Sequence, residues 1–187
     1  MALLRFSGLD LRRALAEVAL IFDRMATNAP VDETLTQAIW DTLRGAKLFP
    51  KRGAYLAINA QGLGIIRDDR LRKAITDLFE LDLSRIEYFE QATLTWRMQT
   101  YHAVLHRQLQ VPLDVLAEAT AGERFASTAA AGLQLRDWEA MRSDPDLSML
   151  LLDRFGYLKS MEIRYGQALE SIDALLVMID RALAESA

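Results

Sequence analysis

Two long segments with unbroken helical spacing of apolar residues constrain the fold of this chain more than any other feature. The first runs from about residue 69 to residue 110 and contains no glycine or proline. The second runs from about residue 146 to residue 185 and has only Gly156 and Gly166 inside it. Apolar residues at steps of three and four form one hydrophobic face along a helix. At about 1.5 Å per residue, each segment would form a helix of about 60 Å.

Shorter helical segments are predicted over residues 9–26, 32–44, 53–60, 113–121 and 135–142. The first should begin after Ser7-Gly8, and the second should have Asp32 as its N-cap and Gly45 as its C-cap. Because the two long helices are joined by a connection of only about 35 residues, we expect them to lie antiparallel with the shorter helices completing a bundle. The sequence therefore predicts one elongated all-α domain over residues 1–187.

Each long segment has one irregularity in its pattern. In the first, the apolar spacing makes a five-residue step between Phe89 and Leu94. Such a step rotates the buried face, which predicts that the two halves pack against different neighbours or that the helix bends. In the second, Gly156 and Gly166 each cost up to about 1 kcal/mol relative to alanine. We expect close contact with another helix, or a slight bend, to compensate.

The composition indicates a folded globular protein and excludes several classes of site. Of 187 residues, 51% are hydrophobic and 26% are charged, with a net charge of -4. The absence of cysteine excludes disulfides, thiolate nucleophiles and cysteine-bound metals. No apolar run approaches the about 20 residues that a membrane-spanning helix needs. Charged residues interrupt the N-terminal segment, so we do not expect a signal peptide there.

Turn residues, apolar residues and positive charge meet in one corner, between Gly45 and Ile75. Within it, the glycines of Gly62-Leu63-Gly64-Ile65-Ile66 permit positive φ angles. We expect the three apolar side chains of this segment to tuck beneath the next helix, with Asp68 or Asp69 as its N-cap. The same corner carries seven cationic side chains, which form a candidate contact patch for anionic lipid or an acidic partner: Lys47, Lys51, Arg52, Arg67, Arg70, Arg72 and Lys73. The ordinary interpretation is that these side chains solvate a loop and pair with neighbouring acids.

The corner resembles a bacterial family of unknown function. The resemblance covers roughly residues 48–80: a turn at Phe49-Pro50, then Tyr55, then the Gly62–Ile66 segment, then Leu71-Arg72 at the start of a long helix. Members of that family carry a single N-terminal transmembrane helix followed by a helical domain outside the cytoplasm. The resemblance implies a location beside a membrane and no particular reaction. Because this sequence lacks the transmembrane helix, it implies either an anchor encoded before Met1 or a soluble relative.

The only two histidines, His102 and His106, are spaced to project from one face of the first long helix. This spacing can hold a metal ion when a third ligand comes from elsewhere. The catalytic zinc signature is absent, because Ala103 stands where its glutamate would be. We therefore prefer two ordinary surface or boundary histidines, and keep a weak metal site as the alternative.

No other pattern indicates catalysis or a cofactor. No serine lies in a nucleophile motif, and the Gly-Leu-Gly segment lacks the Lys-Ser/Thr ending of a phosphate-binding loop. Trp40, Trp96 and Trp138 are expected to belong to the core, with a ligand cavity as the alternative. Nucleic acid binding is not expected, because the chain is acidic and the corner has no series of aromatic residues.

The leading hypothesis is a non-enzymatic, cofactor-free helical module that serves in interaction or sensing. It would be the extracytoplasmic part of a membrane-anchored bacterial protein, on the periplasmic side of the inner membrane, or a cytoplasmic protein if no anchor precedes it. The second hypothesis is a helical bundle that binds a small ligand or a metal ion. The third is a cytosolic homodimeric adaptor, with apolar area exposed near the step between Phe89 and Leu94.

Overall fold

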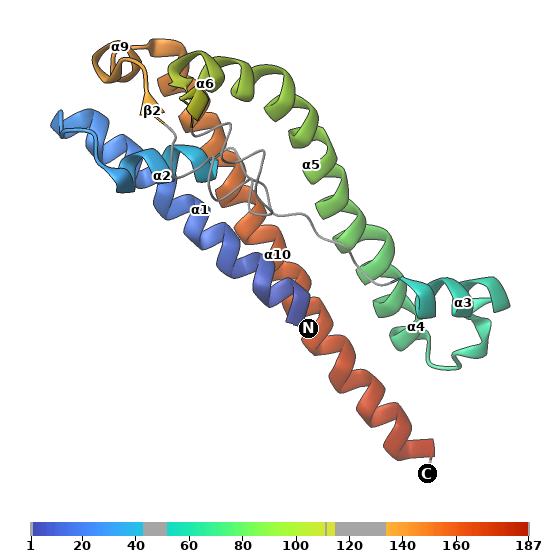
Figure 1. Cartoon of the computed structure of the whole chain (residues 1–187). Coiled ribbons are helices and arrows are strands. Elements are labelled where there is room, and N and C mark those ends of the chain that lie inside the picture. The colour runs from blue at the N-terminus through green and yellow to red at the C-terminus, as the bar shows by residue number, and fades with distance from the viewer. Residues whose placement is uncertain (1, 43–51, 111, 115–133, 187) are drawn as a thin grey trace. The chain divides into compact units, whose positions relative to one another are not determined.

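The computed structural model describes residues 2–42, 52–110, 112–114 and 134–186 (Figure 1). These residues form an all-α fold, as predicted. The helices are α1 (Ala2–Thr27), α2 (Glu33–Thr42), α3 (Gly53–Gln61), the 3-10 helix η1 (Leu63–Ile65), α4 (Asp69–Thr76), the π-helix η2 (Asp77–Asp82), α5 (Leu83–Trp96), the π-helix η3 (Arg97–Tyr101), α6 (His102–Gln108), α9 (Trp138–Arg142) and α10 (Pro145–Ser186).

Both long helical segments exist, with one correction at the end of the first. The run from α4 through η2, α5 and η3 to α6 is continuous in the chain, and α10 matches the second segment. The helix ends at Gln108 rather than at Gln110, because β1 (Leu109–Gln110) pairs antiparallel with β2 (Gln134–Leu135). The same pairing delays the helix that we expected from residue 135. It begins at Trp138, after Asp137 caps it by accepting a hydrogen bond from the backbone N–H of Ala140 at 2.9 Å.

The other shorter predicted helices are confirmed within one or two residues where the structure describes them, except at the start of the first. There α1 begins at Ala2 and continues through Ser7 and Gly8. A single internal glycine costs about 1 kcal/mol, which the surrounding alanine, leucine and arginine residues offset. The predicted C-cap at Gly45 and most of the predicted helix over residues 113–121 lie outside the described residues.

The chain divides into two compact units. Unit 1 comprises Met1–Asp10, Ala46–Ala92 and Ser160–Ala187, and unit 2 comprises Leu11–Gly45 and Thr93–Lys159. The boundary between Ala92 and Thr93 falls within the five-residue step of the apolar pattern. The two halves of this helix therefore belong to different units, while the predicted alternatives, different neighbours or a bend, stay a prediction. The prediction of a single domain stays a prediction.

Unit 2 is built around a hydrophobic core to which each of its segments contributes. Its fully buried members include Leu35, Tyr101, Leu105 and Leu147. The three tryptophans pack against this core as half-buried side chains, which confirms the prediction that they belong to it: Trp40, Trp96 and Trp138. The hydroxyl of Tyr101 donates to Thr42 Oγ1 at 2.6 Å, so this buried polar group is paired within the core.

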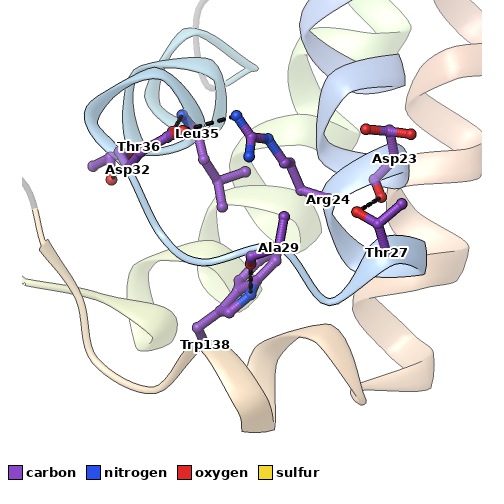
Figure 2. A network of polar contacts seen from close by, with 8 residues as sticks. All are labelled: Asp23, Arg24, Thr27, Ala29, Asp32, Leu35, Thr36 and Trp138. Carbon is purple, nitrogen blue, oxygen red and sulfur yellow. Dashed lines mark hydrogen bonds and ion pairs between the residues drawn. The ribbon is translucent and has the colours of Figure 1, made fainter.

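The turn between α1 and α2 is fixed by polar contacts (Figure 2). Asp32 is the N-cap of α2, as predicted, because its carboxylate accepts a hydrogen bond from the backbone N–H of Leu35 at 2.8 Å. Arg24 forms an ion pair with the same carboxylate at 2.7 Å. From α9, the indole N–H of Trp138 donates to the carbonyl of Ala29 at 3.1 Å. These contacts hold the start of α2 beside the end of α1.

The two glycines in α10 do not lie at close contacts with another helix, contrary to our expectation. A Cβ atom added at Gly156 or at Gly166 would meet nothing within 4 Å, so neither glycine makes room for a close helix contact. The only described glycine with a positive φ angle is Gly62, at 88°. The explanation by close helix packing was therefore wrong for Gly156 and Gly166.

We expect Gly156→Ala and Gly166→Ala each to raise the free energy of unfolding by about 0.5–1 kcal/mol. Alanine keeps the helical backbone, fills open space and loses less conformational entropy on folding than glycine does. Urea unfolding followed by circular dichroism measures the change. Gly62→Ala is the matched control and should destabilise, because its positive φ angle strains any side chain. Destabilisation by Gly156→Ala or Gly166→Ala would contradict this prediction.

Candidate functional site

The predicted contact patch lies in unit 1, at the corner formed by α3, η1 and α4. Residues close together in the sequence determine the backbone of this corner. Gly62, with its φ angle of 88°, ends α3 and lets the chain enter η1. Asp68, one of the two predicted candidates, caps α4 rather than Asp69, because its carboxylate accepts hydrogen bonds from the backbone N–H groups of Arg70 and Leu71.

Three of the patch cations are engaged by acidic neighbours. Arg52 Nη2 lies 2.7 Å from Glu87 Oε2. Arg72 pairs with Asp69 and also donates to the carbonyl of Ile66 at 3.0 Å, and Lys73 pairs with Asp77. For these three side chains the ordinary interpretation, charge pairing at the surface, describes their surroundings. Such exposed pairs contribute only about 0–1 kcal/mol each.

Two patch cations remain available for another molecule. Arg67 and Arg70 are exposed and make no ion pair with any residue that the structure describes. Lys47 and Lys51 lie outside the described residues. Within the described residues, Arg67 and Arg70 are therefore the members of the predicted patch that make no ion pair.

Exposed apolar side chains accompany these two arginines. Leu56 on α3 is 56% exposed and Ile65 in η1 is 58% exposed. We expected Leu63, Ile65 and Ile66 to tuck beneath the next helix. This was wrong for Ile65, while Leu63 and Ile66 are half-buried. The three-residue turn of η1 points successive side chains in different directions, so they cannot all face α4. The corner therefore exposes large apolar side chains as well as two arginines that make no ion pair with a described residue.

Aromatic and polar contacts tie the corner to the rest of unit 1. The ring of Tyr55 stacks on the ring of Phe79, with centroids 4.3 Å apart and an interplanar angle of 5°. The Tyr55 hydroxyl donates to Glu80 Oε1 at 2.6 Å, and this hydrogen bond raises the pKa of Tyr55. Both partners belong to η2, a π-helical segment of the kind that often occurs at functional sites. The buried ring of Tyr55 and the half-buried ring of Phe79 thus connect α3 to η2.

The predicted metal site stays a prediction. His102 and His106 belong to α6, but their side chains lie outside what the structure describes. Among the described side chains, no group of three histidines or acids is arranged to hold a metal ion.

A second site, which sequence reasoning missed, lies in unit 2 between α1 and α2. A cavity of about 390 Å³ is lined there by Arg13, Glu17, Leu20, Glu33, Thr34, Gln37, Ala38 and Asp41. Arg13 spans two carboxylates: its Nε lies 2.7 Å from Glu17 Oε1, and its Nη2 lies 2.7 Å from Asp41 Oδ2. The pairing of Arg13 with Glu17 could be found from their four-residue spacing. The approach of Asp41 depends on how the two helices pack, which no local pattern reveals.

The electrostatics of this cavity are set by burial. The pKa of Glu17 is raised above its ordinary value, mainly because burial disfavours the charged carboxylate, while the hydrogen bond from Arg13 acts in the opposite direction. The nearby Asp41 carboxylate raises it further. The pKa of Arg13 is also raised, first by its hydrogen bond to Glu17. The site therefore concentrates negative charge around one guanidinium.

The raised pKa of Glu17 predicts a specific dependence of stability on pH. The folded state binds the Glu17 proton more tightly than the unfolded state does. The resulting stabilisation is fully present below the unfolded pKa and is lost as the pH rises through the folded pKa. Relative to Glu17→Gln, the wild type should therefore lose stability as the pH rises from the unfolded pKa of Glu17 through its raised folded pKa. Urea unfolding followed by tryptophan fluorescence reports this, because all three tryptophans lie in unit 2 with Glu17. A difference between the two proteins that does not change with pH would contradict the prediction.

Comparison with family models, with curated proteins and with solved structures found no match. The resemblance of the corner to a membrane-anchored bacterial family therefore stays a prediction. Within the described ranges, no helix combines the length and the apolar character that crossing a bilayer requires.

Proposed function

We propose that this chain is a non-enzymatic helical module that serves in interaction or sensing beside an anionic membrane surface, with the α3–η1–α4 corner as its contact. The observation that carries the proposal is that one corner exposes both Leu56 and Ile65 and, in addition, Arg67 and Arg70, which make no ion pair with any described residue. Membrane surfaces take up apolar side chains at the headgroup boundary and attract cations to anionic lipids.

The proposal includes a location and an anchor, both of which rest on the family resemblance. It places the module on the extracytoplasmic side of a bacterial inner membrane, held there by a transmembrane helix encoded before Met1. An uninterrupted apolar segment of about 20 residues upstream of Met1 in the native reading frame would support this. A homodimer, the third hypothesis from the sequence, stays a prediction.

We also propose that the two long helices lie antiparallel, as the sequence predicts. Two hydrogen bonds within unit 1 support this arrangement. The hydroxyl of Tyr165 donates to Glu90 Oε1 at 2.5 Å, and the hydroxyl of Ser171 donates to Asp82 Oδ2 at 2.7 Å. The later residue of α10 thus pairs with the earlier residue of the other helix, which is the order that antiparallel segments give.

Vesicle binding tests the membrane proposal. The whole chain should co-sediment with vesicles of phosphatidylcholine and phosphatidylglycerol, and much less with phosphatidylcholine alone. Each cation near an anionic surface contributes about 1 kcal/mol, so Arg67→Glu with Arg70→Glu should weaken binding by at least about tenfold. Raising the salt concentration should weaken the binding of the wild type. Ile65→Ser should weaken it at every salt concentration, because the apolar contribution is not screened.

The matched control reverses two exposed arginines elsewhere in unit 1, Arg85 on α5 and Arg181 on α10. Arg85→Glu with Arg181→Glu changes the net charge by the same amount as the corner variant but should bind vesicles nearly as the wild type does. If the two double variants lose vesicle binding to the same extent, net charge explains the effect, and the corner is rejected as the contact. An absence of binding to anionic vesicles would reject the membrane proposal itself.

A further inference from the structure

We propose that an exposed stripe of unit 1 is the interface of a weak homodimer, in which a second copy of this chain lies antiparallel across it. The stripe consists of Leu81 in η2 and of Arg85, Tyr88 and Ala92 on α5, and we call these four residues the outer stripe. None of them belongs to the α3–η1–α4 corner, so the inference goes beyond the membrane proposal and does not rest on it. The homodimer hypothesis from the sequence named only a neighbourhood in the chain, and the outer stripe gives it a defined surface.

The outer stripe is the exposed side of a helical segment whose other side is buried. Its residues follow one another at steps of four, three and four, which places them on one face. The exposed fraction is 45% for Leu81 and 71% for Tyr88, and Arg85 and Ala92 are exposed as well. Tyrosine and arginine are enriched in protein interfaces, so the composition of the stripe suits a protein partner. The buried residues of α5 lie between the stripe positions in the chain: Leu83, Ile86 and Glu90.

The cation and the aromatic ring of the outer stripe are both available to another molecule. Arg85 makes no ion pair and no ring contact with any residue that the structure describes. The one acid within helical reach of it, Asp82, is directed elsewhere and accepts a hydrogen bond from Ser171 Oγ on α10 at 2.7 Å. The Tyr88 ring meets the Phe89 ring at an interplanar angle of 86°, with centroids 5.8 Å apart, and is otherwise exposed.

An antiparallel copy of the same helix complements the outer stripe at every position. With a two-fold axis between residues 86 and 87, Arg85 is as far from the axis along the chain as Tyr88, and Leu81 is as far as Ala92. Each Arg85 guanidinium therefore meets the Tyr88 ring of the second copy, an attractive contact between a cation and an aromatic face. Each leucine likewise meets an alanine, so that large side chains lie opposite small ones. A two-fold interface repeats both contacts.

Charge selects this arrangement over a parallel one. In a parallel pair, Arg85 would lie opposite Arg85 of the second copy, and like charges in an interface are unfavourable. The neighbouring acids do not oppose the antiparallel pair, because they are engaged within each copy. Glu80 accepts a hydrogen bond from the hydroxyl of Tyr55, and Glu87 pairs with Arg52.

The dimer should be weak. One crossing of two helices gives an interface at the low end of the size range for specific complexes, which suits a dissociation constant of about 10–100 μM. At about 1 μM or below the chain is then a monomer. The vesicle experiment belongs in that range, where the variant that includes Arg85→Glu tests charge alone.

Sedimentation equilibrium of the whole chain, from about 1 to about 500 μM, tests the proposal. The wild type should show a reversible monomer–dimer equilibrium. Arg85→Glu and Tyr88→Ala should each weaken it at least about tenfold, because each removes both copies of the central contact. Arg181→Glu is the matched control: it makes the same charge change at an exposed arginine of unit 1 outside the stripe, and should leave the equilibrium unchanged.

Cross-linking tests the register of the pair. The chain contains no cysteine, so introduced cysteines are its only thiols. Packed helices lie about 8–10 Å apart, within reach of a short bismaleimide. A mixture of Leu81→Cys and Ala92→Cys chains should cross-link at least about tenfold faster than either variant alone, because identical positions lie about 16 Å apart along the helix axis.

Three results would overturn the proposal. The first is a monomer at every concentration tested. The second is a dimer whose dissociation constant is unchanged in both Arg85→Glu and Tyr88→Ala. The third is cross-linking of the mixture that is no faster than that of the single variants. Because the substituted side chains are exposed, each variant should keep the circular dichroism spectrum of the wild type.

Discussion

Replacing Leu147 with alanine is expected to lower the free energy of unfolding by about 2–5 kcal/mol. Leu147 lies at the start of α10, is fully buried and belongs to the hydrophobic core of unit 2. Truncation removes buried apolar surface and leaves a cavity that close-packed neighbours fill only in part. Because the three tryptophans of the chain all lie in unit 2, fluorescence-monitored urea unfolding reports the loss in this unit.

Leu152→Ala is the matched control for Leu147→Ala. Leu152 lies five positions further along α10, in the same unit, and is 53% exposed. Both substitutions exchange leucine for alanine within one helix, so their effects on helix propensity cancel in the comparison. The control should stay within about 0.5 kcal/mol of the wild type. Similar losses for the two variants would mean that Leu147 is not packed in the core as the structure places it.

Tyr165→Phe should cost about 1.5–3 kcal/mol in unit 1, the range for a hydrogen bond to a charged group. The hydroxyl of Tyr165 donates to Glu90 Oε1 at 2.5 Å, and both residues are buried. Without the hydroxyl, the buried carboxylate of Glu90 loses a donor that water cannot easily replace. Because unit 1 has no tryptophan, unfolding should be followed by far-ultraviolet circular dichroism.

Two comparisons make this prediction specific. Tyr88→Phe removes the same hydroxyl from a side chain that is 71% exposed on α5, and should change stability by less than about 0.5 kcal/mol. Glu90→Leu combined with Tyr165→Phe removes both polar partners. The double variant should lower the free energy of unfolding by less than the sum of the two single variants. A fully additive double variant would show that the two groups do not depend on each other.

The two candidate sites have different physical origins. The corner patch combines apolar exposure with unpaired cations at a surface, which suits a broad and salt-sensitive contact. The unit 2 cavity instead combines carboxylates of low exposure, Glu17 and Asp41, with an exposed arginine that pairs with both of them.

The sequence by itself determined the features that depend on residues close together in the chain. Apolar spacing located α10 and the helical run from Asp69 to Gln108, because the helix period is a local property of the backbone. Asp32 was identified as a cap, and Asp68 as one of two candidates with Asp69, since a carboxylate accepts hydrogen bonds from amides two or three residues away. The five-residue step between Phe89 and Leu94 was also visible in the sequence, because it changes which face of one helix is apolar, and the boundary between Ala92 and Thr93 falls within it.

Only the tertiary structure decided which residues from distant segments meet. The pairing of β1 with β2, the approach of Asp41 to Arg13 and the hydrogen bond from Tyr165 to Glu90 each join segments more than 20 residues apart. It also decided that Ile65 is exposed and that Gly156 and Gly166 face open space. The physical reason is that burial and pairing depend on the neighbours that packing supplies, whereas helix period and capping depend only on the chain itself.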